Sequence, residues 1–176
     1  SVMRPLRFLE TRGVEVTVVS CSAAGELDPA DVRKALRKNT RMVVLTHASN
    51  VTGTILPVEE VGAMLRQRDN VMFCVDAAQT AGALPIDVEK MGIDLLAFTG
   101  HKSLYGPQGT GGLFIHEGLD KKINPLMMGG TGSRSEFERH PEFMPDRYES
   151  GTPNAIGICG LRAGAEFILE QTVETI

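Results

Sequence analysis

The sequence predicts an α/β domain with a mostly parallel central sheet. Short runs of β-branched and apolar residues alternate with segments of helical periodicity along most of the 176 residues. This alternation is typical of parallel sheets covered by helices. Polar clusters directly follow three of the apolar runs. Because ligands bind beyond the carboxyl ends of the strands in such sheets, these clusters form the candidate site.

The first elements are a helix, a strand and a second helix. The first helix is predicted over residues 2–11 and is closed by Gly13. Residues 14–19 are rich in β-branched side chains and predict a strand. The second helix is predicted to begin at Asp28-Pro29 and to run to about Lys38, because aspartate suits an N-cap and proline suits the first turn.

The middle of the chain repeats the order of strand and helix. A short apolar strand is predicted at residues 41–46 and a helix at residues 57–68. Residues 71–75 and 95–99 are nearly all apolar, which predicts strands buried on both faces. A further short strand is predicted at residues 111–115, as the neighbour of the strand before it.

The last part of the chain is predicted to be a long loop followed by a long helix. Residues 117–153 lack clear periodicity and hold many glycine, proline and charged residues. A loop of that length in a compact domain is usually functional or a partner contact. From about Asn154 an alternation of small and apolar residues predicts the helix.

Composition and charge exclude several classes of function. The net charge is -4 and the basic residues are scattered, so we expect neither nucleic acid nor a membrane as a partner. No apolar stretch is long enough to span a bilayer. The three cysteines are an odd number without metal-ligand spacing, which indicates no metal site and favours a reducing, cytoplasmic location.

The cluster after residues 95–99 contains Thr99, His101 and Lys102 around Gly100. A lysine that points into a cleft is desolvated, which lowers its pKa and makes it a nucleophile toward carbonyl groups. Thr99 and His101 offer donors suited to a phosphate. Taken alone, a lysine beside a glycine turn is more often a solvated surface residue.

Asp76 and Gln79 form the cluster after residues 71–75. A carboxylate where an apolar strand leaves the core needs a cationic or donor partner, such as a protonated pyridine nitrogen. Gln79 is close enough in sequence to reach a hydroxyl on the same ring. An aspartate that caps the following turn is the simpler interpretation. The third cluster holds Asn50, commonly a turn residue, and His47, more often a structural histidine.

Together these clusters resemble the class V aminotransferase family of fold-type I pyridoxal-phosphate (PLP) enzymes. The resemblance covers essentially the whole chain. It is most specific in the cofactor-lysine segment and in the strand-end aspartate motif. The matching segments are residues 93–102 with 109–113, residues 75–79, residues 46–50 with 53–54, and residues 147–154.

The resemblance implies a three-layer α/β/α fold and a role for each polar residue at the cofactor ring. Lys102 is expected to bind PLP covalently and later to move protons. Asp76 is expected to pair with the pyridine nitrogen. Gln79 and Asn50 are expected near the ring hydroxyl and the substrate.

The resemblance also implies a phosphate site shared between two subunits. Thr99 and His101 are expected to bind the phosphate of PLP in their own subunit. Thr152 is expected to reach the phosphate of the neighbouring subunit, so the functional unit would be a homodimer. The loop at residues 117–153 would be part of that contact.

The motifs are most similar to those of the cysteine desulfurase and selenocysteine lyase group. The expected activity removes sulfur (or selenium) from cysteine to give alanine. The expected partners are a small amino-acid substrate and a sulfur-acceptor protein. An aminotransferase or epimerase acting on another amino acid, or a catalytically incomplete PLP-fold domain, remain alternatives. A nicotinamide-binding domain is disfavoured, because no G-x-G-x-x-G opens a helix after the first strand.

The resemblance further implies that residues 1–176 are a single domain and only a part of the large, PLP-binding domain. An N-terminal segment with the ring-stacking residue and a phosphate loop is expected upstream. A C-terminal small domain is expected downstream. The nucleophilic cysteine and the arginine that binds the substrate carboxylate are likewise expected outside this chain.

Overall fold

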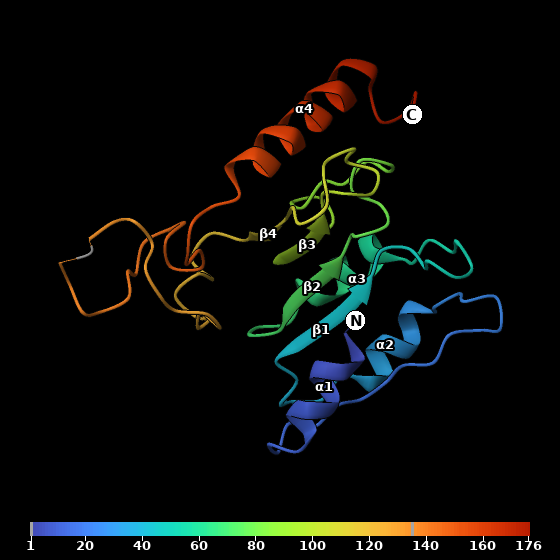
Figure 1. Ribbon diagram of the computed structural model, residues 1–176. Coiled ribbons are helices and arrows are strands. Elements are labelled where there is room, and N and C mark those ends of the chain that lie inside the picture. The colour runs from blue at the N-terminus through green and yellow to red at the C-terminus, as the bar shows by residue number, and fades with distance from the viewer. Residues whose placement is uncertain (1, 135) are drawn as a thin grey trace.

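The computed structural model describes residues 2–134 and 136–176. Along residues 29–99 the elements follow in the order helix, strand, helix, strand, strand, which is the order that the sequence predicts (Figure 1). The helices are α1 (Met3–Glu10), α2 (Pro29–Ala35), α3 (Val58–Leu65) and α4 (Ala155–Gln171). The strands are β1 (Met42–Thr46), β2 (Met72–Asp76), β3 (Leu95–Thr99) and β4 (Gly111–Ile115).

The four strands form one mostly parallel sheet in the order β1-β2-β3-β4. β2 is parallel to both β1 and β3, whereas β4 is antiparallel to β3. Thr46 lies opposite Asp76, and Asp76 lies opposite Ala97. The carboxyl ends of the three parallel strands therefore meet at one edge of the sheet, toward which their arrowheads point in Figure 1. The predicted fold class is confirmed.

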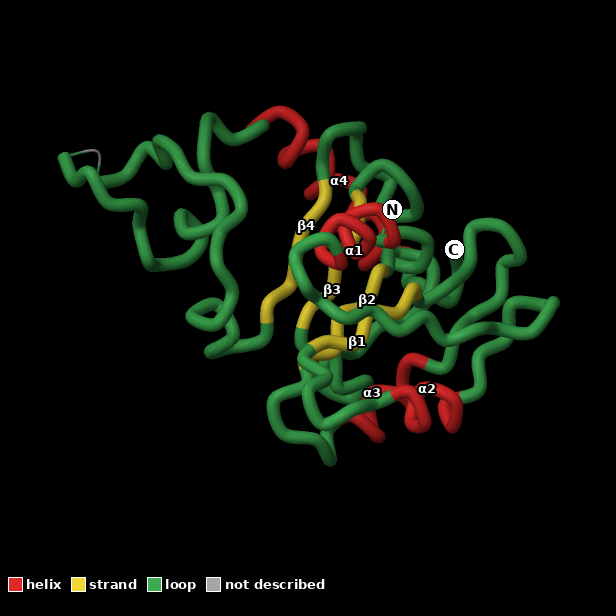
Figure 2. Tube along the Cα trace, turned by 90° about the horizontal axis from the view of Figure 1, so that it is seen from below, coloured by secondary structure: helices red, strands yellow, loops and turns green. Residues whose placement is uncertain are grey.

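The main hydrophobic core lies between α2, α3 and one face of the sheet. Phe73 and Val75 are two residues apart in β2, so they share the face that packs on the helices, and both are fully buried. Val61 of α3 is fully buried against them. Figure 2 shows α2 and α3 together on this side, and α1 and α4 toward the other side. This gives the expected α/β/α layering.

The strand predicted at residues 14–19 is wrong. The segment is extended and mostly exposed, and it pairs with no strand of the described residues. Arg37 holds it through side chains, donating to the Glu15 carboxylate at 2.7 Å and to the Thr17 hydroxyl at 3.3 Å. β-branched residues favour an extended backbone, but they do not supply the partner that a strand's N–H and C=O groups need.

The predicted helices are present, although three of them are shorter than expected. Asp28 is the N-cap of α2, and its carboxylate accepts a hydrogen bond from the Ala30 N–H at 2.8 Å. Asn154 caps α4 in the same way, accepting from the Gly157 N–H at 3.0 Å. α4 is the longest of the described helices, and none of them has the length and apolar composition that a bilayer crossing requires.

Residues 117–153 form a long loop, and their described part contains no helix or strand. In Figure 1 this loop extends away from the sheet. The Tyr148 hydroxyl lies 2.7 Å from the Asp120 carbonyl oxygen and 2.9 Å from that of Ile123. Arg147 also donates to the Ile123 carbonyl, at 3.2 Å. The motif near the end of the loop thus ties the two ends of the loop together.

Candidate active site

Polar side chains gather at the edge of the sheet where β1, β2 and β3 end. Asp76 is the last residue of β2, and Thr99 is the last residue of β3. Both are half-buried, because a strand's final residue leaves the core while neighbouring strands still flank it. The structure therefore places both residues at the strand ends, and Asp76 belongs to the strand itself.

Lys102 lies in a tight turn directly after β3. Two backbone hydrogen bonds of 2.8 Å close this turn, from the Gly100 N–H to the Thr110 carbonyl and from the Gly106 N–H to the Gly100 carbonyl. A Cβ on Gly100 would collide with the Thr110 hydroxyl, so this close approach requires glycine. The Lys102 side chain is exposed at this edge, where a ligand can reach its amine.

Gly82 brings the turn after β2 against the turn after β3. Its φ is +88°, and a Cβ at this position would collide with the Ser103 carbonyl oxygen. Ser103 is the neighbour of Lys102, so the Asp76 and Lys102 turns pack closely against each other at Gly82. Gly82 was not predicted as a site residue, because a single glycine signals a turn but not what the turn approaches.

The two residues expected to bind phosphate within this chain are hydrogen-bonded to each other. The Thr99 Oγ1 and His101 Nδ1 atoms are 2.7 Å apart. Thr99 is half-buried, whereas the His101 side chain is exposed. A neutral imidazole and a hydroxyl have two polar protons between them, and this bond uses one, so the pair keeps one proton to donate to an anion.

Asp76 and Gln79 share the turn that follows β2. Asp76 Oδ1 accepts a hydrogen bond from the Ala78 N–H at 3.0 Å, which is the capping contact that the simpler interpretation predicts. An ionised carboxylate has about four acceptor positions, so this contact leaves capacity for a ligand. Gln79 is half-buried at the same edge.

His47 directly follows β1 and is buried. Its Nδ1 lies 2.9 Å from the Thr80 hydroxyl oxygen. Burial lowers the pKa of His47, so the ring is neutral near pH 7. These contacts agree with the structural interpretation of His47. Thr80 was not predicted, because no sequence pattern pairs residues that are 33 positions apart.

The side chains of Asn50 and Thr152 make no hydrogen bond to the other candidates within the described residues. Asn50 is exposed in a turn that the Ser49 N–H closes by donating to the Thr54 carbonyl at 2.9 Å. Thr152 is exposed in the loop before α4. Within the described part of the chain, no hydrogen bond joins either side chain to the Asp76 or Lys102 turn. The roles expected for these two residues stay predictions.

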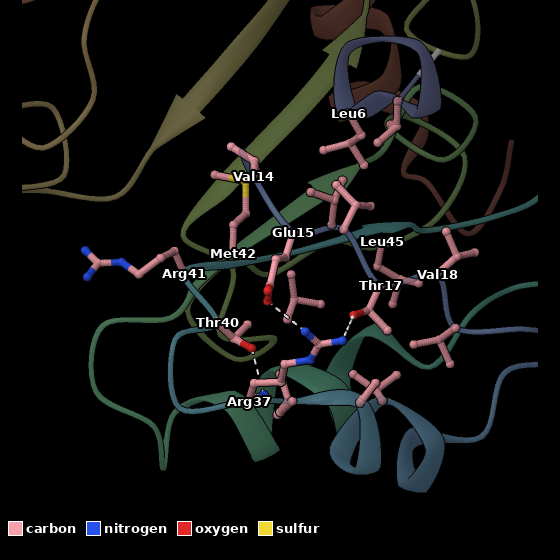
Figure 3. Close-up of a pocket in the computed structure, with 18 of the residues that line it drawn as sticks. Leu6, Val14, Glu15, Thr17, Val18, Arg37, Thr40, Arg41, Met42 and Leu45 are labelled. Carbon is pink, nitrogen blue, oxygen red and sulfur yellow. Dashed lines mark hydrogen bonds and ion pairs between the residues drawn. The ribbon is translucent and has the colours of Figure 1, made fainter. Parts of the chain in front are cut away.

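A cavity of about 700 Å³ lies between α1, residues 14–19, α2 and β1 (Figure 3). Aliphatic side chains such as Leu6, Val18 and Leu45 line much of it, and Arg37 makes its hydrogen bonds beside them. None of the predicted cofactor residues lines this cavity. An aliphatic wall offers few donors for a phosphate, so the polar edge of the sheet is the better candidate site.

Residues 1–176 match the family described as aminotransferase class-V. The chain belongs to the class-V aminotransferase family. The match covers the whole chain, in agreement with the motifs found along its length. The polar edge described above is therefore the edge at which the cofactor lysine of this family is expected.

Class-V aminotransferases similar to this chain include several cysteine desulfurases. The chain is 38% identical over 175 residues to cysteine desulfurase IscS of Dictyoglomus turgidum. The matched region covers 99% of this chain and 40% of that protein. Its structure matches apo cysteine desulfurase of Thermococcus onnurineus NA1 with a TM-score of 0.87 and 35% identity, over 97% of this chain and 43% of that one. SspA in complex with cysteine matches with a TM-score of 0.81 and 33% identity, over 94% and 44%. The chain thus spans about 40% of the length of these relatives.

The polar groups at the edge fit PLP, the cofactor that the family implies. Lys102 offers a primary amine for its aldehyde, and Asp76 offers a carboxylate for a protonated ring nitrogen. The bonded pair of Thr99 and His101 offers a donor for the phosphate. The Gly82 contact holds the turns that carry the amine and the carboxylate against each other, as a single ligand that binds both groups requires.

Proposed function

We propose that the protein containing residues 1–176 is a PLP-dependent cysteine desulfurase, which removes sulfur (or selenium) from cysteine to give alanine. The observation that carries this proposal is the contact of Gly82 with Ser103, which joins the turns of Asp76 and Lys102. Similarity to several cysteine desulfurases, and to SspA in complex with cysteine, supports cysteine as the small amino-acid substrate.

Each residue at the ring has a distinct role in this proposal. When bound, PLP supplies an electron sink for the negative charge that forms at the substrate's α-carbon. Lys102 holds the cofactor covalently and moves protons at its amine. Asp76 keeps the ring nitrogen protonated, and Gln79 and Asn50 contact the ring hydroxyl and the substrate.

The proposed phosphate site needs two subunits. The bonded pair of Thr99 and His101 binds the phosphate within its own chain, and Thr152 donates to the phosphate of the neighbouring subunit of a homodimer. A sulfur-acceptor protein takes up the released sulfur. The three cysteines are free and odd in number, which supports a cytoplasmic location, where thiols stay reduced.

Residues 1–176 are, in this proposal, a part of the PLP-binding large domain and hold no nucleophilic cysteine. Burial, and then the negative charge of Asp76, raises the pKa of Cys74, so its thiol stays protonated at neutral pH. The nucleophilic cysteine and the arginine for the substrate carboxylate are proposed to lie in the remainder of the protein.

The test is to assay the full-length protein with PLP, cysteine and dithiothreitol, which reduces the released sulfur, for sulfide and alanine. Borohydride reduction, digestion and mass spectrometry then locate the pyridoxyl group. We expect turnover in the wild type, the pyridoxyl group on Lys102, and loss of both in Lys102→Ala. Lys38→Ala, which changes an exposed lysine in the turn before β1, is the matched control. A pyridoxyl group on another lysine, or none, would refute the assignment.

A further inference from the structure

Two polar residues, His47 and Thr80, are buried among the described residues. Their side chains are hydrogen-bonded to each other. Only 5% of His47 and 2% of Thr80 are exposed. The His47 Nδ1 and Thr80 Oγ1 atoms are 2.9 Å apart. Burying polar groups is costly unless they are hydrogen-bonded, so each of these residues depends on the other.

This pair closes both ends of the turn that carries Asp76 and Gln79. At the start of the turn, the His47 main-chain N–H donates to the Asp76 carbonyl at 2.9 Å. At its end, the His47 ring bonds to Thr80. Inside the turn, the Thr80 N–H donates to the Ala77 carbonyl at 3.0 Å. One residue of the neighbouring strand end therefore holds the first and the last residue of the turn.

His47 is itself fixed from the core. Its carbonyl accepts a hydrogen bond of 2.9 Å from the N–H of Leu56, which is buried. Because burial lowers the pKa of His47, the ring is neutral and its Nδ1 is either a donor or an acceptor. The Thr80 hydroxyl can serve as the partner in both cases, so the bond forms with either tautomer.

We propose that His47 and Thr80 form a clamp that positions the Asp76 carboxylate and the Gln79 amide against the cofactor ring. The inference rests on the proposed function, because it assigns the clamp a purpose at the PLP site. Neither residue is a catalytic residue in this account. Both act through the turn, by preventing Asp76 and Gln79 from shifting relative to the end of β1.

The informative variant in the full-length holoenzyme is Thr80→Val, which keeps the shape of the side chain and removes the hydroxyl. Without the clamp the turn is free to shift, and a displacement of about 1 Å costs roughly 100-fold in rate. We expect kcat to fall roughly 10- to 100-fold. We also expect the ¹⁵N resonance of ¹⁵N-labelled PLP to move toward that of an unprotonated ring nitrogen. In the cofactor-free protein, amide hydrogen exchange should accelerate at residues 77–80.

Conservative variants separate positioning from general destabilisation. Thr80→Ser keeps the hydroxyl and should restore kcat, the ¹⁵N resonance and the amide exchange. His47→Asn keeps a polar group near the position of Nδ1 and should retain the resonance, whereas His47→Gln moves that group away and should lose it. This pair carries the test if Thr80→Val does not fold. Val61→Ala, in the buried face of α3, is the control for lost stability alone.

Two results would contradict the account, at different levels. If wild-type protein carries no PLP on Lys102, the proposed function fails, and the clamp at the cofactor fails with it. The second result starts from a wild-type protein that is an active holoenzyme. If Thr80→Val and Val61→Ala then lose the same melting temperature and have the same kcat and ¹⁵N resonance, only the clamp is overturned.

Discussion

Asp76 ends a buried strand with its carboxylate half out of the core, and its Oδ1 caps the next turn. Asp76→Asn preserves the shape and a capping oxygen but removes the charge that keeps a ring nitrogen protonated. We expect kcat to fall by roughly a thousandfold or more, because the electron sink is lost. Borohydride reduction should still attach the pyridoxyl group to Lys102. Steady-state kinetics and mass spectrometry measure the two effects.

A matched control for Asp76 is Asp87, which is exposed and caps its own turn by accepting from the Lys90 N–H at 2.9 Å. Asp87→Asn changes the same chemical group in the same kind of turn, away from the candidate site. Its kinetics should be those of the wild type. Near-normal turnover in Asp76→Asn would exclude the role assigned to that carboxylate.

Cys74 should be the least reactive of the three thiols. Burial raises its pKa, and the charge of Asp76 raises it further, whereas Cys21 and Cys159 are exposed. Since the thiolate is the nucleophile, a raised pKa leaves less of it at any pH below that pKa. Alkylation of Cys74 by iodoacetamide should therefore be slow at pH 7–8. An ordinary thiol has a pKa of about 8.5. The alkylation rate of Cys74 should rise only at a higher pH than the rate of such a thiol.

Peptide mass spectrometry over time and pH measures this order of labelling. In urea the three cysteines should label at similar rates, because burial is lost. In the native protein, Asp76→Asn should speed the labelling of Cys74, because the repulsive charge is gone. Equal labelling of Cys74 and Cys21 in the native protein would contradict the burial argument.

At the scale of single residues, the sequence predicted where a residue lies along its strand better than which residues it contacts. Asp76 and Lys102 could be picked out because each lies at the end of an apolar run, and the structure places them there. The bond between His47 and Thr80 could not be predicted, since folding alone brings these residues together. Pairwise contacts between turns depend on the register of the strands beneath them, which local sequence does not encode.

At the scale of elements, Gly82 is the position where a small change should disturb the site most. In Gly82→Ala, the positive φ costs about 1–2 kcal/mol, and the collision with Ser103 adds roughly 1–3 kcal/mol. We expect the free energy of unfolding to fall by roughly 2–5 kcal/mol in urea titrations. PLP binding should weaken as well, because the two turns must separate.

Gly13 provides the control for backbone strain alone. It has a similar φ of +85°, but no atom lies within 4 Å of a Cβ built there. Gly13→Ala should cost only about 1–2 kcal/mol and should leave PLP affinity unchanged. If the two variants have the same effect on stability and PLP binding, the Gly82 contact does not hold the site together.

Propensity predicted the type of most elements but not every boundary or pairing. The helix expected to reach about Lys38 ends at Ala35, because Leu36 is extended and packs against the core. Residues 14–19 and β1 are both rich in valine, yet only β1 has a partner, which is β2. Tertiary contacts decide between such segments, and a single sequence does not reveal them.

At the scale of the whole molecule, the alternation of elements was sufficient to predict a mostly parallel sheet. Residues 111–115 were predicted to neighbour β3, and they do, as β4. The antiparallel direction of β4 was not predicted. It follows from the turn after β3, where the Gly100 N–H donates to the Thr110 carbonyl and sends the chain back along β3.

The long loop carries exposed apolar side chains that one copy of the chain leaves uncovered. Leu126 is 99% exposed, and Met127 and Met128 beside it are also exposed. The Gly151 N–H donates to the Gly130 carbonyl at 2.7 Å, which joins this apolar group to the segment of Thr152. Contiguous exposed apolar side chains mark interaction surfaces. In a symmetric dimer the same apolar group would be covered on both subunits.

Leu126→Asp in the full-length protein tests whether this loop makes the proposed homodimer. Placing a charge in an apolar interface should raise the dimer dissociation constant by roughly 30-fold or more, as for an interface hot spot. PLP affinity should fall as the dimer dissociates, because Thr152 donates to the phosphate held by the other subunit. Thr152→Val should weaken PLP binding without dissociating the dimer.

Leu169→Asp, on the exposed part of α4, is the control and should change neither the dimer dissociation constant nor the PLP affinity. Sedimentation velocity and PLP titration measure both. A Leu126→Asp protein that stays dimeric at nanomolar concentration with full PLP affinity would show that the loop is not the contact.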